Sequence, residues 1–223
     1  MAYVDDYQDA LDRTRRLGLT VPPRVEIHPD PNLRYLTAAR QQQFPHVIHK
    51  AIGPVGAEEL VAQCMSIHHR LQPVIEEWLG VPAVYTIGWV ETSGDGFFKF
   101  DEAYARSLLQ KAAQKAAPPQ SLGVHVWLTL PSMELLDLSL ATSVAFAQKM
   151  PEGVGRVMAK HANDVTDMAY KPMLLVDDFL RRIGALLEFL ACHPPSIAPR
   201  ESGHASRDHH RDQSPTGNVH RRH

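Results

Sequence analysis

A change of hydrophobic period at Gly80-Val81-Pro82 constrains the fold of this chain more than any other feature. From residue 57 to 79, apolar residues recur at three- and four-residue steps, which is typical of an amphipathic helix. After the change, the segments AVYTIGWVE, FFKF and VHVWLTLP alternate with a period of two and contain many β-branched and aromatic residues, which favours strands. A helix followed directly by strands predicts an α+β fold, in which an antiparallel sheet packs on that helix.

The remaining patterns predict helices at both ends of the chain and one helix among the strands. Pro73 is expected to kink or divide the 57–79 helix, because proline removes a helical hydrogen bond. Gly94-Asp95-Gly96 predicts a hairpin, and MELLDLSL predicts a strand that pairs with VHVWLTLP through a tight Pro131-Ser132 turn. The expected helices cover about residues 3–17, 36–44, 101–116, 141–149, 153–161 and 176–191, and residues 169–175 are expected to be extended.

The composition changes abruptly after Cys192. Residues 193–223 hold six of the 13 histidines, five arginines and almost no large apolar side chain. Such a segment buries too little surface to offset the entropy lost on ordering, so we expect a disordered tail. Residues 1–192 are expected to form a single α+β domain.

Composition and charge exclude several classes of protein. The formal net charge of −2 over 223 residues argues against a dedicated nucleic-acid binder, which carries a strong basic excess. The acidic N-terminus has no apolar signal region, and no apolar run reaches the roughly 18 residues of a membrane-spanning helix. Two cysteines indicate a reduced compartment, so we expect a cytoplasmic protein, although export by a signal-less route stays open. The sequence does not indicate an oligomeric state.

Three residues stand out by their positions in these elements. Cys64 lies on the apolar face of the predicted helix, His125 on a strand, and Asp137 among leucines on the next strand. If these strands pair about Pro131, His125 and Asp137 lie nearly opposite each other. The carboxylate would then orient the imidazole, and the imidazole would take the proton of the Cys64 thiol and make it a nucleophile. Each residue alone is also typical of ordinary packing: a buried thiol, a half-buried histidine or a carboxylate that contacts backbone amides.

Over residues 57–140 the chain resembles the transglutaminase-like branch of the papain-like cysteine enzymes. The resemblance rests on Gln63-Cys64, Gly80-Val81-Pro82-Ala83-Val84-Tyr85, Ile87-Gly88-Trp89-Val90, His125-Val126-Trp127 and Glu134-Leu135-Leu136-Asp137-Leu138-Ser139. It implies a Cys64, His125 and Asp137 triad that transfers an acyl group to water or to an amine, with no cofactor. The family places its cysteine at the first turn of the helix, whereas the apolar pattern here begins at Ala57. Either a break occurs just before Gln63, or a thiolate at Cys64 lacks the support of the helix dipole. Leu138-Ser139 replaces the Pro-Thr that usually follows the acidic residue.

The function expected from these residues is a cysteine-dependent amide hydrolase or acyltransferase that acts on a peptide or protein substrate. Gln63 is a candidate donor to the oxyanion, with a solvent-facing glutamine as the alternative. The pairs His68-His69 and His46-x-x-His49 invite a metal site, but neither has a convincing second pair of ligands. Two other functions stay open: a non-catalytic binding or accessory protein of this fold, and an effector or toxin that modifies a foreign protein.

Overall fold

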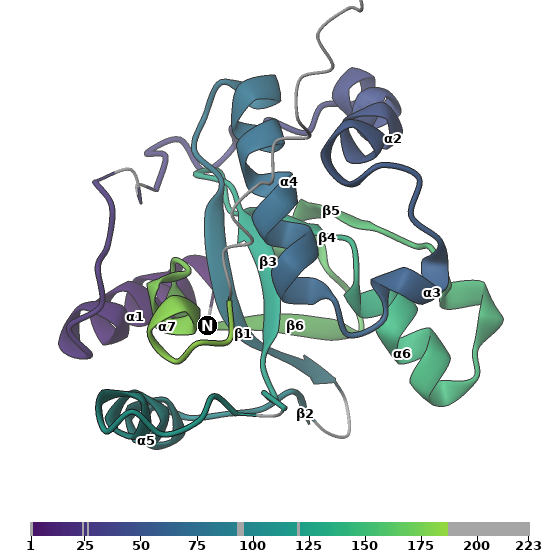
Figure 1. Cartoon of the computed structure of the whole chain (residues 1–223). Coiled ribbons are helices and arrows are strands. Elements are labelled where there is room, and N and C mark those ends of the chain that lie inside the picture. Colours follow the sequence, from purple (N-terminus) through teal and green to yellow (C-terminus); the bar gives the residue numbers. More distant parts are fainter. Residues whose placement is uncertain (1, 24, 26, 93–95, 120, 187–223) are drawn as a thin grey trace, which may run out of the picture. The chain divides into compact units, whose positions relative to one another are not determined.

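A curled antiparallel sheet, which forms a half-barrel, organises the computed structural model of this chain (Figure 1). The structure describes residues 2–23, 25, 27–92, 96–119 and 121–186. The strands follow the order β2-β1-β3-β4-β5. The strand β6 pairs with β1 on the edge opposite to β3. Their bounds are β1 (Val84–Thr92), β2 (Gly96–Phe97), β3 (His125–Thr129), β4 (Glu134–Asp137), β5 (Met158–His161) and β6 (Met168–Leu175).

Seven α-helices lie among the described residues. They are α1 (Tyr3–Arg16), α2 (Ala38–Ile52), α3 (Ala57–Leu60), α4 (Cys64–Leu79), α5 (Glu102–Ala113), α6 (Leu140–Gln148) and α7 (Asp178–Arg182). Figure 1 shows α4 crossing in front of β3 and β4. None of these helices combines the length and the apolar character that crossing a bilayer requires.

The two faces of the sheet belong to two apolar clusters because side chains alternate along a strand. Val126 and Leu128 of β3 point to the side of α4, where they pack with Leu71 and other buried residues of that helix. Trp127, between them, points to the opposite face and packs with Tyr7 of α1. The prediction of an α+β fold with an antiparallel sheet is therefore confirmed.

The helix predicted over residues 57–79 is divided, but not at Pro73. The chain leaves the helix after Leu60, and Ala62 adopts a left-handed conformation with φ of 58°. A new helix begins at Cys64 and continues through Pro73 to Leu79. The division at Pro73 was therefore wrong, and the break falls where the apolar pattern shows no interruption.

The β3–β4 hairpin keeps the predicted strand pairing but shifts its register. Leu128 pairs with Leu136 and Thr129 with Leu135, so the pairing is centred at residue 132 rather than 131. Met133 adopts a left-handed conformation with φ of 63° and donates its N–H to the carbonyl of Leu130, which closes the turn. Each residue of β3 therefore pairs with a residue of β4 two positions later than predicted. Because side chains alternate between the two faces with a period of two, every side chain keeps its predicted face.

Two further predictions about elements were wrong in the C-terminal part. Residues 153–161 were expected to be helical, but they contain β5, which pairs with β4 through Leu135 and Lys160. The strand β4 is also shorter than MELLDLSL, since the chain turns into α6 after Asp137. The last predicted helix is confirmed only as the short α7, and its residues 187–191, like the predicted tail, lie outside the described residues.

Gly88 shows why β1 needs a residue without a side chain. It pairs with His125 of β3 on one side and with Pro172 of β6 on the other, beside an irregularity in the β1–β6 register. A Cβ at Gly88 would lie 2.1 Å from the carbonyl oxygen of Lys171 and 2.5 Å from the ring of Trp127. Glycine therefore permits the close approach of strands that surrounds His125.

Candidate active site

The three predicted triad residues all lie at the ends of secondary-structure elements. Cys64 is the first residue of α4, His125 is the first residue of β3, and Asp137 is the last residue of β4. The helix α4 packs along β3, and the register of the hairpin sets His125 diagonally across from Asp137. Residues separated by more than 60 positions in the sequence are thereby brought together at one end of β3 and β4, next to the start of α4.

His125 and Asp137 form a buried, charge-assisted pair. Nε2 of His125 donates to Oδ2 of Asp137 at 2.6 Å. His125 is 2% exposed and Asp137 is 1% exposed. This is the short distance typical of a hydrogen bond between charged groups.

Asp137 accepts four hydrogen bonds besides the one from His125. The hydroxyl of Tyr170 donates to Oδ2 at 2.9 Å, and Oδ1 accepts from the N–H and hydroxyl of Ser139 and from the N–H of Leu140. Burial alone would raise the pKa of Asp137, but the positive charge and hydrogen bond of His125, with these amide donors, hold it well below its usual range. Asp137 therefore remains ionised.

The pKa of His125 moves in the opposite direction. Burial alone would lower it, but the charge and hydrogen bond of Asp137, together with a hydrogen bond and charge interaction with Cys64, raise the pKa of His125 to about 10. Since Nε2 is engaged by Asp137, Nδ1 is the ring nitrogen that remains for the thiol. His125 thus interacts with both the carboxylate and the sulfur.

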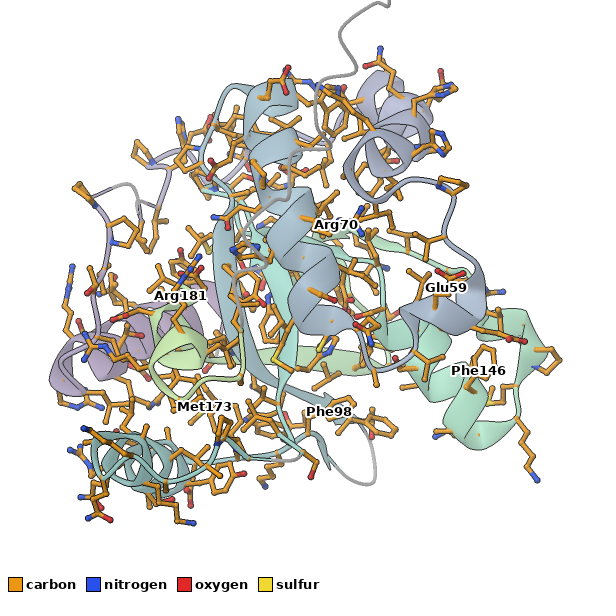
Figure 2. The ribbon with its side chains drawn as sticks, viewed as in Figure 1. Glu59, Arg70, Phe98, Phe146, Met173 and Arg181 are labelled. Carbon is orange, nitrogen blue, oxygen red and sulfur yellow. The ribbon has the colours of Figure 1, made fainter. Side chains whose placement is uncertain are left out.

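Aromatic rings cover the imidazole on both sides. Trp127 stacks on His125 with ring centroids 5.9 Å apart, and Phe98 stacks on it at 5.6 Å with an interplanar angle of 23°. Phe98 follows β2 directly (Figure 2). It is 39% exposed and has a left-handed φ of 62°. A bulky residue rarely adopts this conformation, so the backbone at Phe98 is strained while its ring shields His125 from solvent.

Cys64 lies at the N-terminus of α4, where the helix dipole favours negative charge. Its side chain is buried, with the residue 8% exposed, and Sγ lies 4.0 Å from the carbonyl oxygen of Val124, next to His125. Within the described part of the chain, the backbone N–H of Cys64 donates no backbone or side-chain hydrogen bond. An unpaired amide beside the sulfur can bind an anion.

Gln63 precedes Cys64 and is exposed. Its side-chain oxygen accepts a hydrogen bond from the hydroxyl of Ser66 at 2.9 Å, which orients the amide group. Among the described residues, Nε2 of Gln63 makes no hydrogen bond, so this amide nitrogen has no partner there.

His68 is the site residue that sequence reasoning missed as a structural partner. It is completely buried; Nδ1 donates to the carbonyl of Cys64 at 2.7 Å, and Nε2 accepts from the N–H of Leu138 at 3.1 Å. Nε2 also lies 3.6 Å from Oδ1 of Asp137. His68 thus links the first turn of α4 to the end of β4. The only sequence signal is its position four residues after Cys64, on the same helix face.

The histidine pairs considered as metal ligands lie apart from one another. His46 and His49 are exposed on α2, whereas His69 is near Asp177 and Arg181. Among the residues that the structure describes, no three histidine, cysteine or acidic side chains are grouped as metal ligands.

Comparisons of the chain with protein-family models, with curated proteins and with solved structures found no match in any of the three.

Proposed function

We propose that this chain is a cysteine-dependent amide hydrolase or acyltransferase that acts on a peptide or protein substrate. Cys64 is the nucleophile, His125 transfers the proton, and Asp137 orients His125 and stabilises its cation. The observation that carries the proposal is the 2.6 Å contact between Nε2 of His125 and Oδ2 of Asp137, with Cys64 raising the pKa of the same imidazole. This is the relation of nucleophile, base and orienting acid that acyl transfer requires.

The protonation states support a defined sequence of steps. With a pKa of about 10, His125 carries its proton at neutral pH and can stabilise the thiolate of Cys64. The sulfur attacks the amide carbonyl and forms a thioester, while His125 gives its proton to the leaving amine. The charge of the thiolate has then disappeared, so the pKa of His125 falls and the neutral ring can take a proton from water or an amine. That nucleophile cleaves the thioester and restores the thiol.

The oxyanion of the tetrahedral intermediate forms at the N-terminus of α4. The N–H of Cys64 and Nε2 of Gln63 are the donors that we assign to it. Gln63 precedes α4 and Cys64 begins it, so both residues lie at the positive end of the helix dipole, where a developing negative charge is stabilised. Ser66 holds the amide of Gln63 through its hydrogen bond to Oε1.

One observation favours the non-catalytic alternative. Cys64 is only 8% exposed and Phe98 stacks on the imidazole, so the residues around the sulfur must move before a substrate carbonyl can reach it. In a protein that uses the His125–Asp137 pair only for stability, the sulfur of Cys64 would stay inaccessible. Access of a small reagent to Cys64 therefore separates the two functions.

The test is the rate of Cys64 alkylation by iodoacetamide from pH 5 to pH 9, measured by mass spectrometry in a Cys192→Ser background. At pH 6, we expect Cys64 to react at least about tenfold faster than glutathione, because the proposal requires the imidazolium of His125 to activate the sulfur. His125→Ala should remove this advantage and shift the profile to higher pH. His49→Ala, which changes an exposed histidine of α2, is the matched control and should leave the profile unchanged.

Slower alkylation of Cys64 than of glutathione at every pH would contradict the proposal, since an inert buried thiol behaves in this way. A dependence of the alkylation rate on pH that is the same in the His125→Ala variant would contradict the proposal as well. Either result would favour the alternative, a non-catalytic binding or accessory protein.

A further inference from the structure

A pocket of about 810 Å³ adjoins the candidate site and is not used by the proposed chemistry. It is lined by α2, α6, β5 and β6, and it reaches Asp137 and Tyr170, whereas Cys64 and His125 do not line it. Most of its wall is apolar, with Phe44, Ile48, Leu140, Val144, Met158 and Met168 as examples. This volume falls within the range of small-molecule sites.

The charged side chains that line this pocket carry a net positive charge. Arg156 and Lys160 contribute to its lining, and neither side chain forms an ion pair with any residue of the described ranges. Among the lining residues that the structure describes, Asp137 is the only acidic one, and its charge is compensated by its contact with His125. The pocket therefore combines an apolar interior with uncompensated positive charge.

The mouth of the pocket carries exposed apolar side chains. Met150 and Val157 line the pocket and are 44% and 40% exposed. Phe146 lies nearby on α6 and points away from the body of the protein (Figure 2). It is 42% exposed. Large apolar side chains that are exposed together beside a pocket are typical of a binding surface rather than of the rest of a protein surface.

We propose that this pocket binds an amphipathic anion with a single aliphatic chain and a carboxylate head. The chain lies against the apolar walls from α2 and α6, and the carboxylate is held by Arg156 and Lys160. The inference does not rest on the proposed catalysis, because neither the sulfur nor the imidazole lines the pocket.

The experiment is isothermal titration calorimetry of the full chain with octanoate and decanoate, each below its micelle concentration. We expect decanoate to bind about tenfold or more tightly than octanoate, since each buried methylene strengthens binding roughly fourfold. Decyltrimethylammonium, with the same chain and the opposite charge, should bind at least about tenfold more weakly than decanoate.

Two pairs of variants locate the ligand. Arg156→Gln with Lys160→Gln should weaken decanoate about tenfold and abolish its advantage over decyltrimethylammonium, whereas Lys149→Gln, an exposed lysine outside the lining, should not. Gln148→Trp, at an exposed lining position, should obstruct the pocket, and Ala147→Trp on the same helix is its control. Each variant is first checked for an unchanged melting temperature. If Gln148→Trp does not fold, the charge pair alone decides.

Equal binding of the anionic and cationic chains, or binding of decanoate that appears only as micelles form, would overturn the proposal. The proposal would also be overturned if neither the double variant of Arg156 and Lys160 nor Gln148→Trp changed the affinity for decanoate. Cys64→Ala should retain full decanoate binding, so that failure of the proposed chemistry and failure of this site are separate results.

Discussion

Two buried histidines, one at the start of β3 and one in α4, lie against the same carboxylate but differ in charge. His125 contacts Oδ2 of Asp137 and has a pKa of about 10. His68 lies 3.6 Å from Oδ1, and burial lowers its pKa to about 4 despite the negative charge of Asp137. The same residue type, buried to the same degree, is therefore a cation in one region and neutral in the other.

The difference comes from the hydrogen-bond partners of the two rings. Nε2 of His68 accepts from the N–H of Leu138, and protonation of this nitrogen would break that bond and leave two donors facing each other. Both ring nitrogens of His125 can instead donate, one to Asp137 and the other toward Cys64. Proximity to a carboxylate does not by itself make a histidine basic; a free acceptor for each ring proton is also needed.

The largest expected effect is that of Asp137→Asn, which removes the charge that the two histidines share. Loss of the carboxylate should lower the pKa of His125 below its ordinary value of about 6.5, because burial then dominates. Under the proposed function, we expect activity on an amide substrate to fall by roughly 10³- to 10⁴-fold, as for the same substitution in a known catalytic triad. NMR titration of the His125 ring checks the first expectation without a substrate. A pKa of His125 still well above 6.5 would show that Asp137 does not set it.

The pH dependence of stability should separate the two histidines. His125, with its raised pKa, contributes fully below about pH 6.5, and this contribution is lost as the pH rises toward 10. His68 is stable only as the neutral ring, so its contribution is full above about pH 6.5 and is lost as the pH falls toward 4. Each change should be on the order of 3 kcal/mol in the free energy of unfolding.

Urea unfolding from pH 4.5 to 9.5 measures both limbs. His125→Gln should flatten the alkaline limb and His68→Asn the acid limb, while the exposed His49→Asn should alter neither. One variant that flattens both limbs would show that the histidines titrate together and that the comparison above is wrong.

Gly88→Ala should disturb the region of His125 and spare that of His68. The new Cβ would collide with the carbonyl of Lys171 and the ring of Trp127, which stacks on His125. We expect a loss of about 2 kcal/mol in the free energy of unfolding, as for other overpacked interiors. Thermal melting checks this, and Gly123→Ala, where an added Cβ meets no atom within 4 Å, is the control. Equal melting temperatures for the two variants would contradict the close packing at Gly88.

The smallest effect concerns the break before α4. Ala62 has a φ of 58°, which glycine adopts without strain, so Ala62→Gly should raise the free energy of unfolding by about 0.5 kcal/mol. Ala147→Gly, in the last turn of α6, should instead lower it, by at most about 1 kcal/mol. Chemical denaturation of both variants measures the difference. A destabilised Ala62→Gly would indicate that residues 57–79 form a continuous helix, with Cys64 away from a helix N-terminus.

Local sequence patterns determined the faces and kinds of most elements. The alternation of VHVWLTLP determined that His125 and Trp127 share a face, and the two-residue error in the hairpin register did not matter because side chains repeat with that period. The period change at Gly80 likewise determined where α4 ends and β1 begins. These features depend on neighbouring residues alone.

Only the tertiary structure decided where α4 begins, that residues 158–161 form a strand, and what His68 does. The pairing of β5 is made with β4, more than 20 residues earlier, so a short and weakly patterned segment could not reveal it. His68 has the helix spacing of a core residue, and its partner Leu138 lies 70 positions away. Long-range contacts satisfy these polar groups, and no local pattern records a contact between residues so far apart in the chain.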